Sequence, residues 1–543
     1  FESHCPVLKY WGGSEMYDYI VVGSGSGGSV VAGRLSQDPD IKVCLLEAGG
    51  PDSSVLIHAP AGVAAIMPTK LNNWGFKTTP QPGLNNRRGY QPRGRVLGGS
   101  SSINAMLYIR GHRWDYDHWA ELGCDGWSWD EVLPYFKKAE HNERGADDFH
   151  GSDGPLNVAD QHSTRKIGKA FLSAAEEMQI PLNTDFNGAE QEGIGFYQVT
   201  QKDGERFSAA KAYLTPHLSR PNLTVITRAR ASKILFEGKR AVGVRYVQGG
   251  REIDIKAGRE VILAGGAFAS PQLLKLSGVG PVGELSDHGI EVCHELPGVG
   301  ENLQDHIDYT AVYKSRSRDV LGVSLGGAVD LTRAIFEWRN KRSGLITTPF
   351  AEAGGFLRTK PDLAAPDIQL HFVVGIVDDH NRKLHLGHGF SCHICVLRPK
   401  SRGTVKLGSA NPKHNPLIDP GFFSDEADLD LLVEGYKLTH RILEAPALAS
   451  YRAKQLYKVD MNDDAALRDM IRRRADTVYH PVGSCKMGDD DMAVVDNKLR
   501  VRGLEGLRIA DASVMPTLIG GNTNAPTIMI GERAAEFIQT EAA

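Results

Sequence analysis

The segment from Asp18 to Gly50 constrains the fold of this chain more than any other part of the sequence. Tyr19 to Val22 is a short apolar run rich in β-branched residues, which is typical of a buried strand. The spacing Gly23-x-Gly25-x-x-Gly28 follows at once, and apolar residues at helical spacing come next. A Gly-rich turn between a strand and a helix predicts a dinucleotide-binding unit.

The glycines of this turn have separate roles in such a unit. Gly23 allows the tight turn, Gly25 lets a pyrophosphate approach the backbone, and Gly28 lets the helix pack closely on the strand. The free N–H groups at the helix start attract the phosphates. Glu47 ends a second strand nineteen residues after Gly28, where this fold places an acid for a ribose hydroxyl. An ordinary Gly-rich turn is the alternative, and it does not explain the acid.

Length and composition exclude several classes of protein. The 543 residues are too many for one small core, and 41% apolar residues exclude a disordered chain. A net charge of −4 gives no indication of a nucleic-acid partner. No apolar run reaches the length that spans a bilayer, although peripheral attachment stays open. Residues 1–15 precede Met16 without a signal-peptide pattern, and we expect them to be a non-native extension.

The seven cysteines are scattered along the chain and do not form a disulfide framework. This usage favours a reducing compartment, and we expect a cytoplasmic protein. Cys392 and Cys395 form a lone CxxC pair inside a strand-like run. A metal or redox pair is the alternative to buried structural thiols, but no second pair of ligands is visible.

Further motifs, far apart and in order, accompany the N-terminal unit. They are LLEAGG, GRVLGGSSSINAMLYIRG at 94–111, GAFASPQLLKLSGVG at 266–280, LPGVGENLQDH at 296–306, YHPVGSCKMG at 479–488, LRIADASVMP and GGNTNAPTIMIGERAA. Together they resemble the glucose–methanol–choline (GMC) oxidoreductases, which bind FAD, over essentially all of the chain from Met16. The resemblance is closest to bacterial dehydrogenases of aliphatic alcohols, including the polyethylene glycol type, and then to choline dehydrogenases.

The resemblance implies a mixed α/β fold with two domains. The first is a Rossmann-like FAD-binding domain, discontinuous in sequence, for which we expect residues 16–155, 222–315 and 480–543. The second is a substrate-binding domain of antiparallel sheet plus helices, for which we expect residues 156–221 and 316–479. Within these ranges, helical patterns lie around Trp129–Glu140 and Thr164–Met178.

The resemblance also implies cofactor contacts for individual residues. The residues expected to bind the pyrophosphate are Gly23, Gly25, Ser26, Gly27 and Gly28. Glu47 is expected to bind the adenosine ribose, and the backbone of Ala231 the adenine. The residues expected to contact the flavin and ribityl sections are Arg95, Val96, Gly98, Ser101, Asn104, Ala105, Met106, Leu107, Asp511, Ala512 and Asn524. Ile103 stands where some relatives carry a histidine bonded to FAD, so the resemblance implies non-covalent FAD and no metal.

Oxidation of an alcohol by a flavin needs a base for the hydroxyl proton and an acceptor for the hydride. A base with a pKa near working pH favours histidine, and the developing alkoxide needs a second donor. By resemblance, His480 is the base and Asn522 orients the substrate oxygen. The alternative is that His480 has no catalytic role and is a core or surface histidine whose hydrogen bonds are all made. Tyr479 lines the pocket or merely packs, and Glu352 either balances a cationic substrate or is a solvated carboxylate.

The sequence leaves rival activities to be weighed. Choline dehydrogenase is the main alternative to an aliphatic alcohol dehydrogenase, followed by an alcohol oxidase using oxygen and a hydroxynitrile lyase. A fatty-acid photodecarboxylase is disfavoured, because that branch lacks the catalytic histidine, whereas His480 is present here. Ala351 also stands where that branch carries a cysteine, although Arg398 matches an arginine of that branch. The resemblance favours a quinone or another respiratory-chain component as electron acceptor, with peripheral contact on the inner face of the cell membrane left open.

Overall fold

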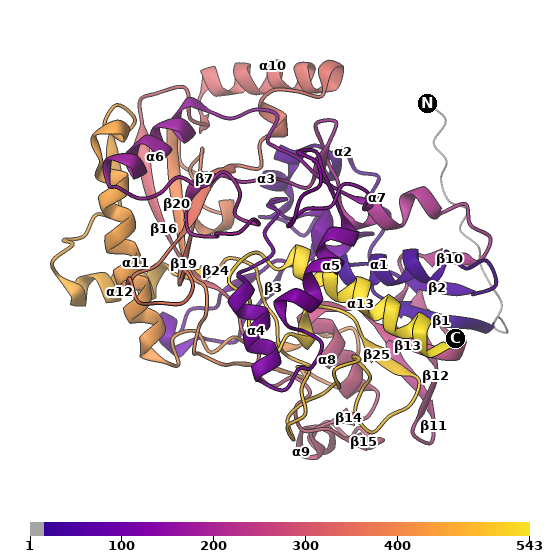
Figure 1. The fold of residues 1–543 in the computed structure, drawn as a ribbon. Helices are drawn as coiled ribbons and strands as arrows, with labels where there is room; N and C mark the ends of the chain where they lie inside the picture. The colour runs from indigo at the N-terminus through magenta and orange to yellow at the C-terminus, as the bar shows by residue number, and fades with distance from the viewer. Residues whose placement is uncertain (1–15, 543) are drawn as a thin grey trace.

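A computed structural model describes residues 16–542 of the chain, so the expected extension at 1–15 lies outside the described residues. Two parts lie side by side, each built on one large sheet (Figure 1). In the first sheet four strands run parallel in the order β10 (Leu223–Ile226), β2 (Val43–Leu46), β1 (Met16–Val22) and β13 (Arg251–Leu263). The antiparallel strands β12 (Arg240–Gln248) and β11 (Arg230–Glu237) continue it, and β25 (Leu507–Ile509) adds parallel to β13.

The first sheet is covered on both faces, which explains why its central strands are almost wholly apolar. Helix α1 (Ser26–Leu35) follows β1, and the C-terminal helix α13 (Asn524–Ala542) packs directly on it (Figure 1). A Cβ on Gly531 would lie 2.8 Å from Cβ of Val30, so glycine is required where the two helices cross. The two ends of the described chain therefore build one unit.

The second sheet is antiparallel, with the order β23-β16-β20-β19-β18-β7. Its strands are β23 (Lys454–Leu456), β16 (Ile307–Ser315), β20 (Gly387–Val396), β19 (Ile368–Val373), β18 (Ala351–Leu357) and β7 (Gly193–Phe196), with β17 (Gly322–Val323) and β24 (Asp476–Thr477) at its margins. Helices α6 (Lys166–Glu177) and α11 (Glu426–Glu444) pack against this sheet. The rings of Phe171 on α6 and Phe372 on β19 stack with centroids 4.3 Å apart.

The predicted fold class is confirmed: a Rossmann-like α/β unit assembled from distant segments accompanies an antiparallel sheet with helices. Both predicted helices are present, as α5 (Trp129–Ala139) and α6. The domain boundaries stay a prediction. Strand β16 pairs in the second sheet, although its residues fall in a segment expected for the cofactor domain.

Cys392 and Cys395 lie buried on β20 as free thiols. Burial raises the pKa of both, which suits inert structural cysteines. Within residues 16–542 no group of three or more His, Cys, Asp or Glu side chains is placed to hold a metal ion. In the same part of the chain, no helix is both long and apolar enough to cross a membrane.

Candidate active site

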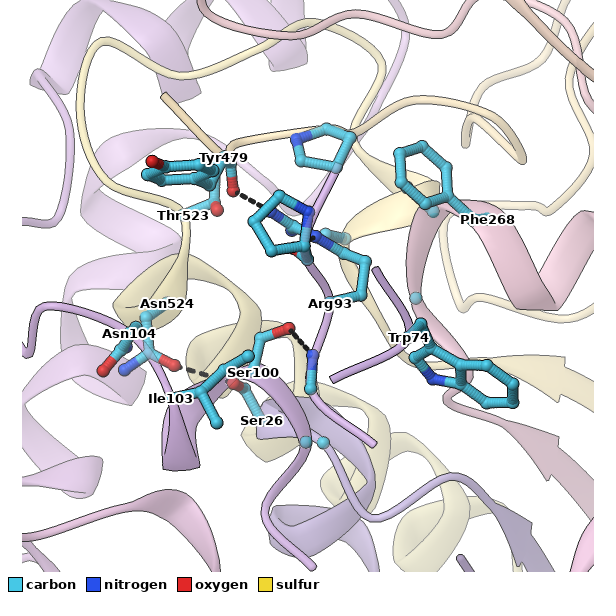
Figure 2. Close-up of a pocket in the computed structure, with 18 of the residues that line it drawn as sticks. Ser26, Trp74, Arg93, Ser100, Ile103, Asn104, Phe268, Tyr479, Thr523 and Asn524 are labelled. Atoms are coloured by element: carbon cyan, nitrogen blue, oxygen red, sulfur yellow. Dashed lines mark hydrogen bonds between the residues drawn. The ribbon is translucent and has the colours of Figure 1, made fainter. Parts of the chain in front are cut away.

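One long cavity runs between the two sheets, and Figure 2 shows part of its wall. At one end, which we term the nucleotide end, it is lined by Gly25, Glu47 and Ala231 from the first sheet. At the other, the substrate end, it is lined by His480 and Asn522 together with side chains of β18, β19 and β20. Predicted catalytic residues and many of the predicted cofactor residues therefore line the same cavity.

The glycines of the first turn form an open cradle at the nucleotide end. Gly23 has φ +104°, and a Cβ there would lie 2.4 Å from the carbonyl oxygen of Ala264. A Cβ on Gly27 would lie 2.0 Å from the carbonyl oxygen of Ala510, so helix α1 has no room to retreat. A Cβ on Gly25 would meet only Ala264 O, at 3.9 Å, because its bare side faces the cavity. The free space over Gly25 and the start of α1 suits a pyrophosphate.

Glu47 holds this turn in place and also faces the cavity. Its Oε2 accepts hydrogen bonds from Ser24 N (3.1 Å) and Ser24 Oγ (2.6 Å), and its Oε1 accepts one from Gly49 N (2.7 Å). Burial raises the pKa of the carboxyl group, and these three donors oppose the shift. A carboxylate has about four acceptor positions, so one remains for a ribose hydroxyl.

Asn524 and Ser26 meet beside this cradle. Ser26 Oγ donates to Asn524 Oδ1 at 2.7 Å, which joins the starts of α1 and α13 (Figure 2). Both residues line the cavity. Asn524 was expected to contact the flavin, and its partner in the structure is a residue expected to hold the pyrophosphate.

Two buried cations beside the cavity were missed by the sequence analysis. Arg206 donates to Asn104 Oδ1 (2.7 Å), Ser101 O (3.2 Å) and Ile57 O (3.0 Å), and burial lowers its pKa to about 9. Arg93 donates from Nη2 to Tyr479 O at 2.7 Å (Figure 2), and burial lowers its pKa to about 10. Neither has a carboxylate within 4 Å among residues 16–542. No spacing marks either arginine in the sequence.

Arg206 determines how Asn104 faces the cavity. Asn104 Oδ1 accepts from Arg206 and also from Met106 N at 3.1 Å. Both lone pairs of that oxygen are then used, so the amide N–H groups of Asn104 remain for a cavity ligand. This orientation suits a hydrogen bond to a carbonyl oxygen or ring nitrogen of the flavin.

The remaining predicted cofactor residues divide into two sets. The residues that line the cavity are Ala105, Met106, Leu107, Asp511 and Ala512. The residues outside the lining are Gly28, Arg95, Val96, Gly98 and Ser101. Gly98 N donates to Ser24 Oγ (3.2 Å), Ser101 Oγ accepts from Ala209 N (3.0 Å), and the Arg95 guanidinium lies 4.6 Å from the Trp74 ring centroid.

His480 is the end of an ordered chain of imidazoles. His306 Nε2 lies 2.9 Å from the carbonyl oxygen of Leu397, and His306 Nδ1 lies 2.9 Å from His480 Nδ1. A carbonyl only accepts, so His306 carries its proton on Nε2 and accepts at Nδ1. His480 therefore carries its proton on Nδ1, and its Nε2 is left as a base. Burial lowers the pKa of both rings, to about 4 for His306, which keeps them neutral.

Asn522 completes this site from the other side. Its Nδ2 lies 3.1 Å from His480 Nε2, and its Oδ1 accepts from Gln369 Nε2 at 3.0 Å. The amide thus points a donor at the space beside the base. In the structure Asn522 Nδ2 donates to His480 Nε2 itself. A hydroxyl that lies beside both nitrogens and replaces this bond can give its proton to Nε2 and accept from Nδ2, which is the pairing that alcohol activation requires.

The residues left undecided by the sequence take definite places. Glu352 is buried outside the cavity lining, where its carboxylate accepts from Arg165 N (2.6 Å) and Thr348 Oγ1 (2.9 Å). Burial raises its pKa to about 7. Arg398 is ion-paired with Asp115 at 2.8 Å. Tyr479 lines the cavity, and its hydroxyl lies 2.6 Å from His380 Nδ1.

His371 is a cavity residue that the sequence analysis did not single out. It lies on β19 within an apolar run, where nothing in the pattern distinguishes it from a core position. It is 5% exposed, and among residues 16–542 neither ring nitrogen has a hydrogen-bond partner. Burial lowers its pKa to about 3, so it adds an uncharged polar group to the substrate end.

Comparison with known proteins agrees with this geometry. The chain matches the GMC oxidoreductase family over residues 17–308 and again over 399–531. The chain belongs to the GMC oxidoreductase family. Among GMC oxidoreductases, it is 49% identical to an alcohol dehydrogenase (acceptor) of Pseudomonas putida over 528 residues, 96% of each chain. It is 43% identical to the mitochondrial choline dehydrogenase of Mus musculus over 540 residues, 97% of this chain and 90% of that one.

The fold has solved relatives of nearly the same extent. The crystal structure of pyridoxine 4-oxidase from Mesorbium loti superposes with a TM-score of 0.87 at 31% identity, covering 97% of this chain and 99% of that one. The predictions of a GMC oxidoreductase and of FAD as its cofactor are confirmed. The open cradle at Gly25 and the position of Glu47 fit the pyrophosphate and ribose of that cofactor.

Proposed function

We propose that this protein oxidises primary aliphatic alcohols to aldehydes with non-covalently bound FAD. The observation that supports this most directly is the unprotonated Nε2 of His480 beside the amide N–H of Asn522. Bound FAD supplies the acceptor, N5 of its ring, for the hydride that leaves the alcohol carbon. His480 takes the hydroxyl proton, and Asn522 stabilises the oxygen as negative charge develops on it. Ile103 lines the cavity with a hydrocarbon side chain, so it offers no atom for covalent attachment.

The lining of the cavity favours a neutral, apolar substrate over choline. The substrate end includes Phe350, Val373 and Val377. The two carboxylates of the described lining, Glu47 and Asp511, both stand among residues expected to hold the cofactor. Glu352 lies outside the lining, where its carboxylate accepts hydrogen bonds from one backbone N–H and one hydroxyl. A trimethylammonium group would need an aromatic cage or a carboxylate, and both carboxylates of the described lining stand among the expected cofactor residues.

The similarity to a dehydrogenase named for a separate acceptor supports a quinone-type electron acceptor rather than oxygen. The rival activities are weaker. A photodecarboxylase would not need the His480–Asn522 pair, whereas a hydroxynitrile lyase would use a histidine without net change in the flavin. Choline dehydrogenase keeps second place, because relatives of that name are 42–44% identical to the chain.

We expect the enzyme to transfer electrons from 1-octanol to a soluble ubiquinone analogue without oxygen. Aldehyde and reduced quinone should form in equal amounts, and replacing the quinone by air should slow aldehyde formation at least about tenfold. The measurement is product analysis under argon and under air with matched enzyme. Equal rates under both conditions would make the protein an alcohol oxidase.

A further inference from the structure

Helix α10 (Leu325–Lys341) presents an apolar face to solvent. The side chains of Leu325, Val329 and Phe336 are 92%, 50% and 62% exposed, and Leu331 and Ile335 are about half exposed. Leu325, Val329 and Phe336 are separated by four and seven residues, so they share one side of the helix. A surface helix of a globular protein normally turns its apolar side inward, and this helix reverses that arrangement.

The opposite side of α10 attaches the helix to the protein. Ala334 and Trp338 are buried and pack with Ala59 and Ile346. The indole Nε1 of Trp338 donates to the carbonyl oxygen of Gly204 at 2.7 Å. In Figure 1 α10 lies along an edge of the molecule with no other element on its outer side. The exposed apolar face is therefore not the result of a detached helix.

The apolar face continues onto the neighbouring loop. Val323, on β17, forms a bridge with Leu386, and β17 pairs with the start of β20. Leu384 and Leu386 are each 72% exposed, and Val323 is 43% exposed. We name the combined set the outer apolar surface: Val323, Leu325, Val329, Phe336, Leu384 and Leu386.

Cations flank the outer apolar surface. Arg333, Arg339 and Lys341 are exposed on α10, and no carboxylate of residues 16–542 lies within ion-pairing distance of any of them. Of the two acids on the same helix, Asp330 is paired with Arg318 at 2.7 Å, and exposed Glu337 accepts a hydrogen bond from Ser343 Oγ at 3.1 Å. Exposed apolar side chains with free cations beside them are the signature of a helix that lies in a membrane interface. A second copy of the chain would bring the same free cations against one another.

The two segments that carry the outer apolar surface are also joined along the chain to residues that line the cavity. After α10 the chain passes through the short turn Leu345–Thr347 and then lines the cavity with Pro349 and Phe350. The loop that carries Leu384 and Leu386 begins just after His380 and Asn381, which line the same cavity. A flat apolar partner at this surface would thus contact segments that lead directly into the lining of the cavity.

We propose that the outer apolar surface docks on an anionic lipid bilayer. The apolar side chains enter the interface, and Arg333, Arg339 and Lys341 face the anionic headgroups. Docking extends the proposed function, because long-chain alcohols and quinones both dissolve in the bilayer. The docking itself requires neither substrate.

Flotation of the FAD-loaded enzyme with phosphatidylethanolamine vesicles, with and without phosphatidylglycerol, tests this inference. The wild type should float with vesicles that contain phosphatidylglycerol, and added salt should weaken the binding. Phe336→Asp combined with Leu325→Asp should lower the partition coefficient more than about tenfold. Leu122→Asp, after α4 (Arg113–Glu121) at another face and 43% exposed, is the matched control and should bind as the wild type does.

Flavin reduction by a short, water-soluble alcohol is followed in the same samples. The rate of flavin reduction should be equal in the wild type, the double variant and Leu122→Asp, so a failure of the proposed chemistry is distinguished from a failure of docking. Absence of wild-type flotation, or equal flotation of the double variant, overturns the inference. A wild-type dimer that the double variant converts to monomers, without vesicle binding, would assign the surface to a second copy instead.

Discussion

Replacement of His480 by alanine should slow reduction of the flavin by a primary alcohol about 10²- to 10⁴-fold, the range for loss of a positioned general base. The reason is that Nε2 of His480 is the basic atom that the chain of hydrogen bonds from Leu397 through His306 leaves unprotonated. The variant should still bind FAD, because His480 lies at the end of the cavity away from Gly25 and Glu47. Anaerobic stopped-flow absorbance of the oxidised flavin measures the rate.

His393→Asn is the matched control for this variant. His393 also lines the cavity, but its Nδ1 is bonded to Asp308 at 2.6 Å and it does not contact His480 in the described hydrogen-bond network. We expect its rate to stay within about tenfold of the wild type. If His480→Ala reduced the flavin as fast as His393→Asn, the assignment of the base would be wrong.

Replacement of Gly25 by valine should weaken FAD binding without damaging the fold. Gly25 has φ −65° and ψ −166°, a conformation open to any residue, and its missing side chain faces the cavity. A valine there would occupy the space over the start of α1 and displace the pyrophosphate from its N–H donors. We expect about 10- to 100-fold weaker FAD binding, the cost of losing about one hydrogen bond to a charged group. Fluorescence titration of the apoprotein with FAD measures it.

Gly27→Ala should instead destabilise the apoprotein, and it serves as the control. Its Cβ would lie 2.0 Å from the carbonyl oxygen of Ala510, so the added methyl group meets backbone rather than cavity. We expect the apoprotein to lose about 1–3 kcal/mol of unfolding free energy, as in other overpacked sites. Equal losses of apoprotein stability in Gly25→Val and Gly27→Ala would show that Gly25 is a packing residue and not part of a cofactor cradle.

The nucleotide end of the cavity could be predicted from sequence because its requirements are local. The turn at Gly23 and the acid at Glu47 each depend on a strand, a turn and a helix that follow one another directly in the chain. The joining of this unit with LRIADASVMP and α13 was also expected, and close packing of Gly531 on Val30 now gives its physical basis. Local spacing carries the turn and the acid, since each residue is placed by its immediate neighbours, whereas the joining of distant segments does not follow from spacing.

The substrate end could be predicted only in part. His480 and Asn522 came from the resemblance, but the partner that sets the protonation of His480 lies 174 residues away at His306. Arg206 and Asn104 are likewise brought together by folding, and no periodicity marks either. The exposure of the apolar face of α10 could likewise not be predicted from sequence. Its residues have the pattern of a core helix, and only the three-dimensional structure shows that Ala334 and Trp338 face the protein while Leu325 and Phe336 face solvent.

The central claim is that His480 and Asn522 activate an aliphatic alcohol for oxidation by bound FAD. The most direct test is anaerobic mixing of the yellow protein with 1-octanol and, separately, with choline, while the absorbance of oxidised flavin is followed. We predict rapid bleaching by 1-octanol and none by choline on the same time scale. Bleaching by choline alone would assign the protein to the choline-oxidising branch, and bleaching by neither would contradict the proposed chemistry.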